Sequence, residues 1–189
     1  MKHYFSLVLL LLTTCSTFKP VKDTSIRHVL EPLVPDRTLA SATPAMAISR
    51  PSIPSYLDRM QLVTRTEGKL VISNLDLWAE PLDAAIARVM ASNLSRLTKS
   101  TNIQPVANFA SLDYTTLLEM NIAQFEPDEA KQMILQGTWK RQPVTGKETS
   151  GHFFRIIVPL PVSDAPMSAR VTAMNQALEQ LAQQIINQQ

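Results

Sequence analysis

Two segments with a helical repeat of apolar residues limit the folds open to this chain. In residues 80–97, Pro81 stands where a helix best tolerates proline, in the first turn, and one face is formed by Leu82, Ala85, Ile86, Val89, Asn93 and Leu97. Residues 164–189 begin with Asp164, a common N-cap residue type, and carry a stripe of Val171, Met174, Leu178, Leu181 and Ile185. Both segments predict amphipathic helices that cover a sheet.

The segments around these helices have strand-like patterns. Glu67-Gly68 separates two of them and predicts a hairpin, while Pro51 and Pro54 limit another to a sheet edge or end it. The last three are joined by short loops, which predicts an antiparallel meander. The predicted strands are 25–33, 45–54, 61–66, 69–73, 115–125, 130–141 and 152–161. The fold class is therefore α/β, a single domain whose mixed, mostly antiparallel sheet is covered by two main helices.

Composition excludes several classes of protein. The formal net charge of the 189 residues is +2, and the basic residues are scattered rather than clustered, so no nucleic-acid partner is predicted. The four glycines form neither GxGxxG nor GxxxxGK, which argues against the common nucleotide-binding loops. The single cysteine permits neither an intrachain disulfide nor a thiolate metal cluster.

The N-terminus has the layout of a secretory signal peptide. Lys2 precedes the apolar run LVLLLL at 7–12, and small polar residues follow. Six apolar residues are far fewer than the roughly 20 that a membrane-spanning helix needs. The plainest interpretation is an ordinary signal peptide cut after Thr14, with Cys15 incidental.

A sharper interpretation is that Leu12-Thr13-Thr14-Cys15 resembles a bacterial lipobox, in which the cysteine becomes the lipidated N-terminus. Thr14 departs from the usual small residue before the cysteine. Two or three acyl chains would make a lasting anchor, and Ser16, in place of Asp, implies export to the outer membrane. The expected organisation is a signal peptide at 1–14, the lipidated Cys15 with a tether at 15–24, and a domain at 25–189.

Residue types that carry chemistry are sparse. His28 and His152 stand outside metal-ligand pairs, and Ser150-Gly151-His152 lacks a nucleophile elbow. Asp76, Glu80 and Asp83 crowd the start of the first helix, where the helix dipole favours negative charge. No catalytic residue, metal site or cofactor is predicted. A glycosidase-like carboxylate pair stays open, because spacing in sequence does not settle distance in space.

Residues 50–97 carry a family resemblance. Pro54-Ser55-Tyr56-Leu57-Asp58, the hairpin that follows, and Leu77-Trp78-Ala79-Glu80-Pro81-Leu82 before the helix match in order. NIAQFE at 121–126 and VTAMNQALEQLAQQI at 171–185 extend the match to about residues 25–186. The chain thus resembles the ABC-type transport auxiliary lipoproteins (PqiC/YmbA-like, membrane integrity-associated transporter subunits).

This resemblance implies a non-enzymatic, outer-membrane lipoprotein of a Gram-negative cell, facing the periplasm. Its implied partners are a periplasmic MCE (mammalian cell entry) protein that conducts lipid and, through it, an inner-membrane permease and ATPase. The implied fold is similar to the N-terminal domain of TolB, and a homo-oligomeric ring is expected. No cofactor and no nucleic acid are implied.

The sequence leaves the partner surface open. Trp78 either packs its ring on the sheet before Pro81, or forms with Tyr56 an exposed aromatic patch suited to a partner. Tyr56, Trp78 and Pro81 are therefore the candidate partner residues. Two other functions stay open: a tethered periplasmic envelope hydrolase that uses the carboxylates and His152, and a free-standing lipid-binding lipoprotein with an apolar cavity.

Overall fold

The protein is described by a computed structural model, which covers residues 22–36, 38–108, 114–128, 132–146, 151–162 and 165–188. Cys15, the predicted signal peptide, Ser150 and Asp164 lie outside these residues. The strands of the described part are β1 Ile26–His28, β2 Met46–Ile48, β3 Gln61–Thr66, β4 Lys69–Trp78, β5 Ile103–Pro105, β6 Thr116–Pro127, β7 Gln132–Pro143 and β8 His152–Pro159. The α-helices are α2 Leu82–Thr98 and α3 Met167–Asn187, and Val106–Asn108 forms a short 3₁₀ helix, η2.

The strands form two sheets rather than one. A five-stranded sheet has the order β5-β2-β6-β7-β8, and a three-stranded sheet has the order β1-β4-β3. The predicted antiparallel meander is confirmed as β6-β7-β8. Parallel pairing occurs only where short strands join, β1 to β4 and β2 to both β5 and β6, among the strands described. The predicted α/β class with two main helices is correct, and the single sheet is refined into two.

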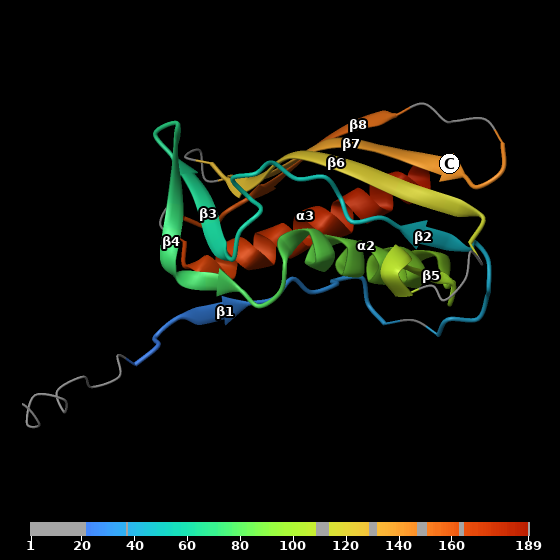
Figure 1. The fold of residues 1–189 in the computed structure, drawn as a ribbon, viewed down its shortest axis with the longest axis horizontal. Coiled ribbons are helices and arrows are strands. Elements are labelled where there is room, and N and C mark those ends of the chain that lie inside the picture. Colours follow the sequence, from blue (N-terminus) through green and yellow to red (C-terminus); the bar gives the residue numbers. More distant parts are fainter. Residues whose placement is uncertain are drawn as a thin grey trace, which may run out of the picture.

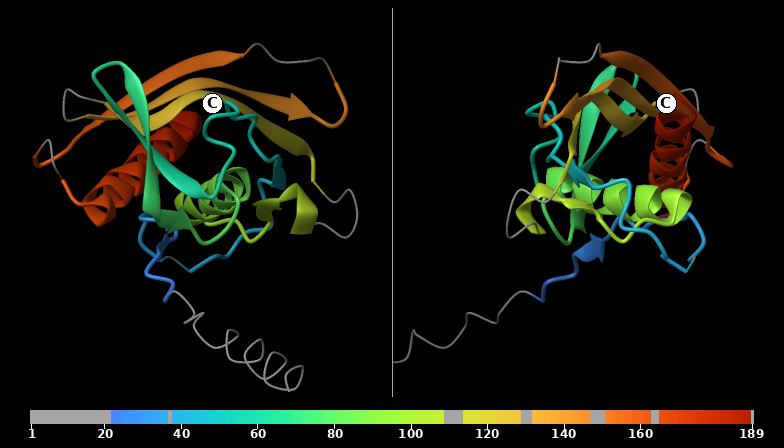
Figure 2. Two further views of the ribbon diagram at one scale, coloured as in Figure 1. Left: turned by 60° about the vertical axis from the view of Figure 1, so that its left-hand side comes forward. Right: turned by 90° about the vertical axis from the view of Figure 1, so that its right-hand side faces the viewer.

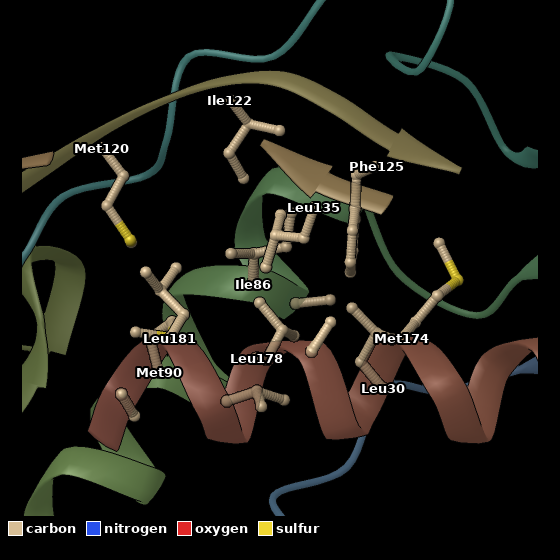
Figure 3. Packing of buried hydrophobic residues seen from close by; sticks show 14 of the residues in the cluster. Leu30, Ile86, Met90, Met120, Ile122, Phe125, Leu135, Met174, Leu178 and Leu181 are labelled. Carbon is tan, nitrogen blue, oxygen red and sulfur yellow. The ribbon is translucent and has the colours of Figure 1, made fainter. Parts of the chain in front are cut away.

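Both helices pack on the same face of the five-stranded sheet (Figure 1). α3 contacts β7 and β8, α2 contacts β2 and β5, and the two helices contact each other. Ile122, Phe125 and Leu135 point from the sheet toward the helices (Figure 3). On the helix side the packing is completed by Ile86, Met90, Met174, Leu178 and Leu181, all of them buried. This interface is the main hydrophobic core.

The two helices begin directly after proline. Pro81 is the N-cap of α2, and its carbonyl accepts a 3.0 Å hydrogen bond from Ala85 N. Lys99 ends this helix in the left-handed conformation, with φ 58°, and donates its N–H to Ser95 O. α3 begins after Pro166, two residues later than the predicted N-cap at Asp164. Prolines suit these positions because no helical hydrogen bond is lost there.

The first two predicted strands are shorter than expected. Regular strand is limited to Ile26–His28 of residues 25–33 and to Met46–Ile48 of residues 45–54, and beyond β2 Ser52 forms only an isolated bridge to Asn121. β2 ends before Pro51, which confirms one of the two alternatives, but it lies between β5 and β6 rather than at an edge. The edge interpretation was wrong because both prolines lie beyond the three residues of β2.

The β3–β4 hairpin lies at one end of the molecule and not beside the middle turns of α2 and α3 (Figures 1 and 2). Its turn is formed by Glu67 and Gly68, whose φ angles of 52° and 70° are the left-handed values that a tight hairpin requires. The hairpin prediction is therefore confirmed. The pairing shifts register between Gln61 and Val63, where extra β4 residues bulge outward.

At Gly137 the backbone of β6 lies very close to β7. A Cβ at this position would lie 2.1 Å from the backbone oxygen of Asn121 and 3.0 Å from the ring of Phe154. β6 shifts register beside it, between Ile122 and Gln124. Glycine is thus required where the bulged strand presses against β7.

Candidate functional site

The three candidate partner residues do not form one exposed patch. Trp78 is only 3% exposed and belongs to the core, so the exposed aromatic patch was wrong and the packing interpretation is correct. Trp78 belongs to the same core cluster as Leu82, the first residue of α2, and its backbone N–H donates to Met60 O. Tyr56 is half-buried against the core, and Pro81 is exposed. Only Pro81 of the three is fully available to a partner.

Tyr56 takes part in a buried ionic cluster that the sequence did not reveal. The side chain of Glu126 on β6 is 0% exposed. Its Oε1 accepts hydrogen bonds from Arg65 Nη2 at 2.8 Å and Nε at 3.1 Å, and its Oε2 accepts from Tyr56 Oη at 3.0 Å and Phe125 N at 3.1 Å. We call Tyr56, Arg65 and Glu126 the ionic latch, because it joins the hairpin to the outer face of the large sheet.

The charges of the latch are mutually stabilised. Burial, followed by the charge of Glu126, raises the pKa of Tyr56 to about 12, so its hydroxyl stays protonated and donates. The hydrogen bonds to Glu126 raise the pKa of Arg65 further above its ordinary value. A buried carboxylate is stable only when paired and hydrogen-bonded. The Glu126 carboxylate meets both conditions, so the latch is a fixed structural junction.

A second polar junction holds β1 on β4. His28 Nε2 lies 2.8 Å from Asp76 Oδ1, and Ser73 Oγ donates to Asp76 Oδ2 at 2.8 Å. Burial acts to raise the pKa of Asp76, but the hydrogen bonds from His28 and Ser73 outweigh it and the pKa is lowered. Ser73 Oγ also accepts from Asp76 N and Leu75 N, which builds the bulge of β4. His28 is thus a structural residue, as the sequence indicated.

The carboxylates near α2 separate onto different partners. Glu80 binds Arg88, whose Nη2 also donates to Leu30 O at 2.8 Å. Asp83 lies in the first turn of α2 and 3.5 Å from Arg50 Nη1. Of the three acids, only Asp83 occupies the dipole position that the sequence suggested. Asp76, Glu80 and Asp83 are thus each bound to a different basic side chain, His28, Arg88 and Arg50.

A shallow groove runs beside the first half of α2. Its volume is about 210 Å³, and its apolar part is formed by Ile48, Ala84, Ala87, Val106 and Ala107. Arg50, Glu80 and Arg88 line it as well. Pro81 follows Glu80 directly, so the segment Leu77–Leu82 of the resemblance borders the groove. Apolar side chains beside charged ones are typical of protein-binding surfaces.

The residues that the hydrolase hypothesis invokes make separate contacts. His152 stacks its ring on Trp139, with ring centroids 4.3 Å apart, and none of three grooves in the described part of the chain is lined by His152 together with Asp76, Glu80 or Asp83. No group of three His, Cys, Asp or Glu side chains in the described part could hold a metal ion. The tethered hydrolase therefore gains no support from the geometry.

A large lipid cavity is not favoured either. The grooves have volumes of about 210 to 270 Å³, below the roughly 300–1,000 Å³ of typical ligand pockets. The space between sheet and helices is filled by side chains such as Phe125, Phe154 and Leu135.

Within the described ranges, no helix has the length and apolar character needed to cross a membrane.

Comparison with known families gives one match. The family described as "ABC-type transport auxiliary lipoprotein component" matches residues 28–186. These residues contain every strand except the start of β1, both helices, the latch and the groove. No curated relative matches the chain.

Two solved structures share the fold. A crystal structure titled as an uncharacterized protein superposes with a TM-score of 0.70 at 18% identity, covering 87% of this chain and 98% of that one. The crystal structure of XCC0632 from Xanthomonas campestris, assigned to the DUF330 family, has a TM-score of 0.67 at 17% identity, covering 85% of this chain and 92% of that one. Both likenesses support the fold described above.

Proposed function

From the premise that this chain belongs to the ABC-type transport auxiliary lipoprotein family, we infer that it is the outer-membrane subunit of an MCE-type lipid transport system. In this role it docks the periplasmic conduit at the outer membrane and supports envelope integrity. The observation that carries the inference is the family match over residues 28–186. Membership makes the chain a transport-associated lipoprotein with an auxiliary role, which favours a non-enzymatic function.

The anchor in this proposal is Cys15. Residues 1–14 would be removed as a signal peptide, and residues 15–24 would tether the domain that begins at residue 25. We expect mass spectrometry to find a diacylated or triacylated Cys15 at the N-terminus of the mature protein. The variant Cys15→Ala should be unlipidated and leave the membrane fraction; unchanged membrane retention would contradict the anchor.

The partner in this proposal is a periplasmic MCE protein, with a permease and ATPase bound through it at the inner membrane. Affinity purification of the lipidated protein from cross-linked membranes should recover an MCE protein. Cys15→Ala serves as the control, because it removes the anchor while leaving the domain intact. Repeated recovery of no MCE protein with the wild-type chain would count against the function.

The groove beside α2 is the proposed docking surface, and it replaces the aromatic patch. Val106 is exposed at its rim, and Pro81 and Arg50 lie close by in the fold. Val106→Arg should abolish recovery of the MCE protein while the protein stays folded. Val144→Arg is the matched control, since Val144 is also exposed but lies at the end of β7 outside the groove. Equal recovery with both variants would place the docking surface elsewhere.

A homo-oligomeric ring is the remaining part of the proposal. β8 is an edge strand of the described sheet, and an edge offers unpaired backbone groups to another chain. Phe153 and Ile157 add exposed apolar side chains on its outer face. Native mass spectrometry of the purified protein should show one closed oligomer, and Phe153→Glu should weaken it. A monomer at all concentrations would contradict the ring.

A further inference from the structure

The outer half of the β3–β4 hairpin carries apolar side chains that the protein itself does not cover. Leu70, Val71 and Ile72 are consecutive, and Leu75 and Ile26 follow along the same sheet. Each of the five is between 39% and 58% exposed. We call these five residues the hairpin surface. Their exposure contrasts with the core-facing strands, whose apolar residues are buried.

The exposure occurs on both faces of the hairpin. Consecutive strand residues point to opposite faces, so Leu70 and Ile72 lie on one face and Val71 on the other. A strand that covers a core or binds a flat protein partner would have one apolar face. On the first face Arg65, the pairing partner of Leu70, binds Glu126 of the large sheet. Leu70 and Ile72 nevertheless stay 39% and 43% exposed beside it. Apolar groups exposed on both faces suit a lipid surface better than a flat protein partner.

Leu75 is presented by a specific device. Ser73 Oγ accepts hydrogen bonds from Leu75 N at 3.3 Å and Asp76 N at 2.9 Å, and this turn makes the bulge in β4. Leu75 is 52% exposed at the bulge. Ile26 pairs with the neighbouring Asp76, so β1 brings its own exposed apolar side chain to the same place. β1, the first strand of the fold, thus contributes Ile26 to the hairpin surface.

The position of the predicted anchor indicates what covers this surface. Ile26 follows Cys15 by only eleven residues, which span at most roughly 37 Å when fully extended. Lys22, Arg27 and Lys69 are exposed beside the surface together with Asp23 and Glu67, so three basic and two acidic residues leave a net charge of only +1. Apolar contact rather than net charge would therefore provide most of the attraction to a membrane.

We propose that the hairpin surface inserts into the headgroup region of the membrane that anchors the protein. This contact would hold β4 against the bilayer through residues that do not line the α2 groove. The occupant is a lipid surface. The proposal rests on the proposed lipid anchor for its orientation, but the contact itself can be measured with or without lipid on Cys15.

The test uses an environment-sensitive dye on a unique thiol. Since Cys15 is the only cysteine, Val71→Cys gives one free thiol when Cys15 is lipidated, and also in the full chain with Cys15→Ser. Val144→Cys is the matched control, because Val71 and Val144 are both 49% exposed. Vesicles of phosphatidylethanolamine with a minority of phosphatidylglycerol serve as the membrane.

With the lipidated chain, the dye at position 71 should brighten and shift to the blue on reconstitution, and the dye at position 144 should not. A water-like dye at position 71 in vesicles that carry the protein would overturn the proposal and leave the anchor intact. Equal shifts at both positions would also overturn it, since they would show no preferred orientation.

Flotation of the vesicles separates the two ideas. If the wild-type chain does not float, the anchor fails, and the contact is then measured by titrating Cys15→Ser chains with millimolar lipid. Binding read at position 71 should weaken roughly tenfold in Leu75→Asn and stay unchanged in Val144→Asn, since Val144 lies outside the hairpin surface and is also exposed. Equal binding in both variants would overturn the proposal.

Discussion

The two sheets of this protein use the same residue types in opposite ways. In the five-stranded sheet, alternate residues of β8 such as Phe154 and Ile156 are buried under α3, while their neighbours face solvent. In the distal half of β4, Leu70, Val71 and Ile72 are exposed on both faces. The large sheet therefore carries the stability, and the small sheet has apolar residues that stability does not require.

The difference also lies in how each sheet is held. Continuous apolar packing fixes the large sheet to both helices. The small sheet is attached through the ionic latch, together with a few buried residues such as Leu62 and Trp78, while the His28–Asp76 pair joins β1 to β4 within the small sheet. Apolar packing is non-directional, whereas hydrogen-bonded ion pairs fix one orientation. The hairpin is thus positioned as well as attached.

The largest effect should come from emptying the packed sheet. Phe125→Ala removes a fully buried ring between sheet and helices and should lower the free energy of unfolding by about 3–5 kcal/mol. Urea denaturation measures this. Phe153→Ala is the matched control, because Phe153 is 62% exposed on the same sheet, and it should cost under about 1 kcal/mol. Equal losses would contradict the assignment of the stability to the packed face of the large sheet.

Breaking the ionic latch should have the next largest effect. Arg65→Met leaves the Glu126 carboxylate buried without its cation, and should cost about 2–3 kcal/mol, less than a fully buried pair because Arg65 is partly exposed. Arg155→Met, which removes an exposed arginine bound to Gln136, is the control. If hydrogen exchange of the hairpin amides does not accelerate in Arg65→Met, the latch does not hold the hairpin.

The His28–Asp76 junction predicts a smaller effect that depends on pH. The folded pKa of Asp76 lies below its unfolded value, so the carboxylate contributes stability above about pH 4 that is lost as the pH falls through the folded pKa. Asp76→Asn should cost under about 1 kcal/mol at pH 7 and flatten the acid end of the stability curve. An unchanged acid slope relative to wild type would contradict this assignment.

The hairpin surface itself should be the least sensitive. Val71→Asn should change the free energy of unfolding by no more than about 0.5 kcal/mol. Val63→Asn, at a buried valine of the same hairpin, should cost more than about 2 kcal/mol because it buries an amide without partners. Comparable losses would show that Val71 supports the fold, and the contrast between buried apolar residues in the large sheet and exposed ones in β4 would then disappear.

Local patterns in the sequence predicted the long elements well. α2 follows from the spacing of Leu82, Ile86 and Val89, and the β3–β4 hairpin follows from Glu67-Gly68. In these elements the interacting residues are neighbours in sequence, so periodicity and turn chemistry carry the information. The meander was equally readable, because each of its strands pairs with the next along the chain.

Pairing between distant segments was not readable. β2 is only three residues long and joins β5 and β6 through parallel pairs, which no local pattern specifies. The split into two sheets depends on these contacts. Trp78 had two open interpretations because its burial depends on which distant residues pack above it. The apolar residues of β4 before Trp78 would have the same sequence pattern whether they were exposed or buried.

The ionic latch was missed for a related reason. Glu126 follows Phe125 near the end of a strand and reads as a solvent-facing residue, yet it meets Tyr56 and Arg65 from segments about 60 to 70 residues away. The sequence did contain a signal of this pair: an acidic residue, Glu126, within an apolar strand, and an arginine, Arg65, in a distant hairpin. The groove beside α2 likewise joins residues from four separate elements, β2, α2, β5 and η2.

The parallel pairing of β1 with β4 has a mechanical consequence. The N-terminal side of the chain, which the proposed anchor would hold, enters the fold through β1. A pull along that strand shears its hydrogen bonds to β4 all together instead of opening them one at a time like a zipper. His28 and Asp76 lie across the same pair and share the force. A domain tethered at this end would resist sudden tension from a moving membrane before any of its core residues were strained.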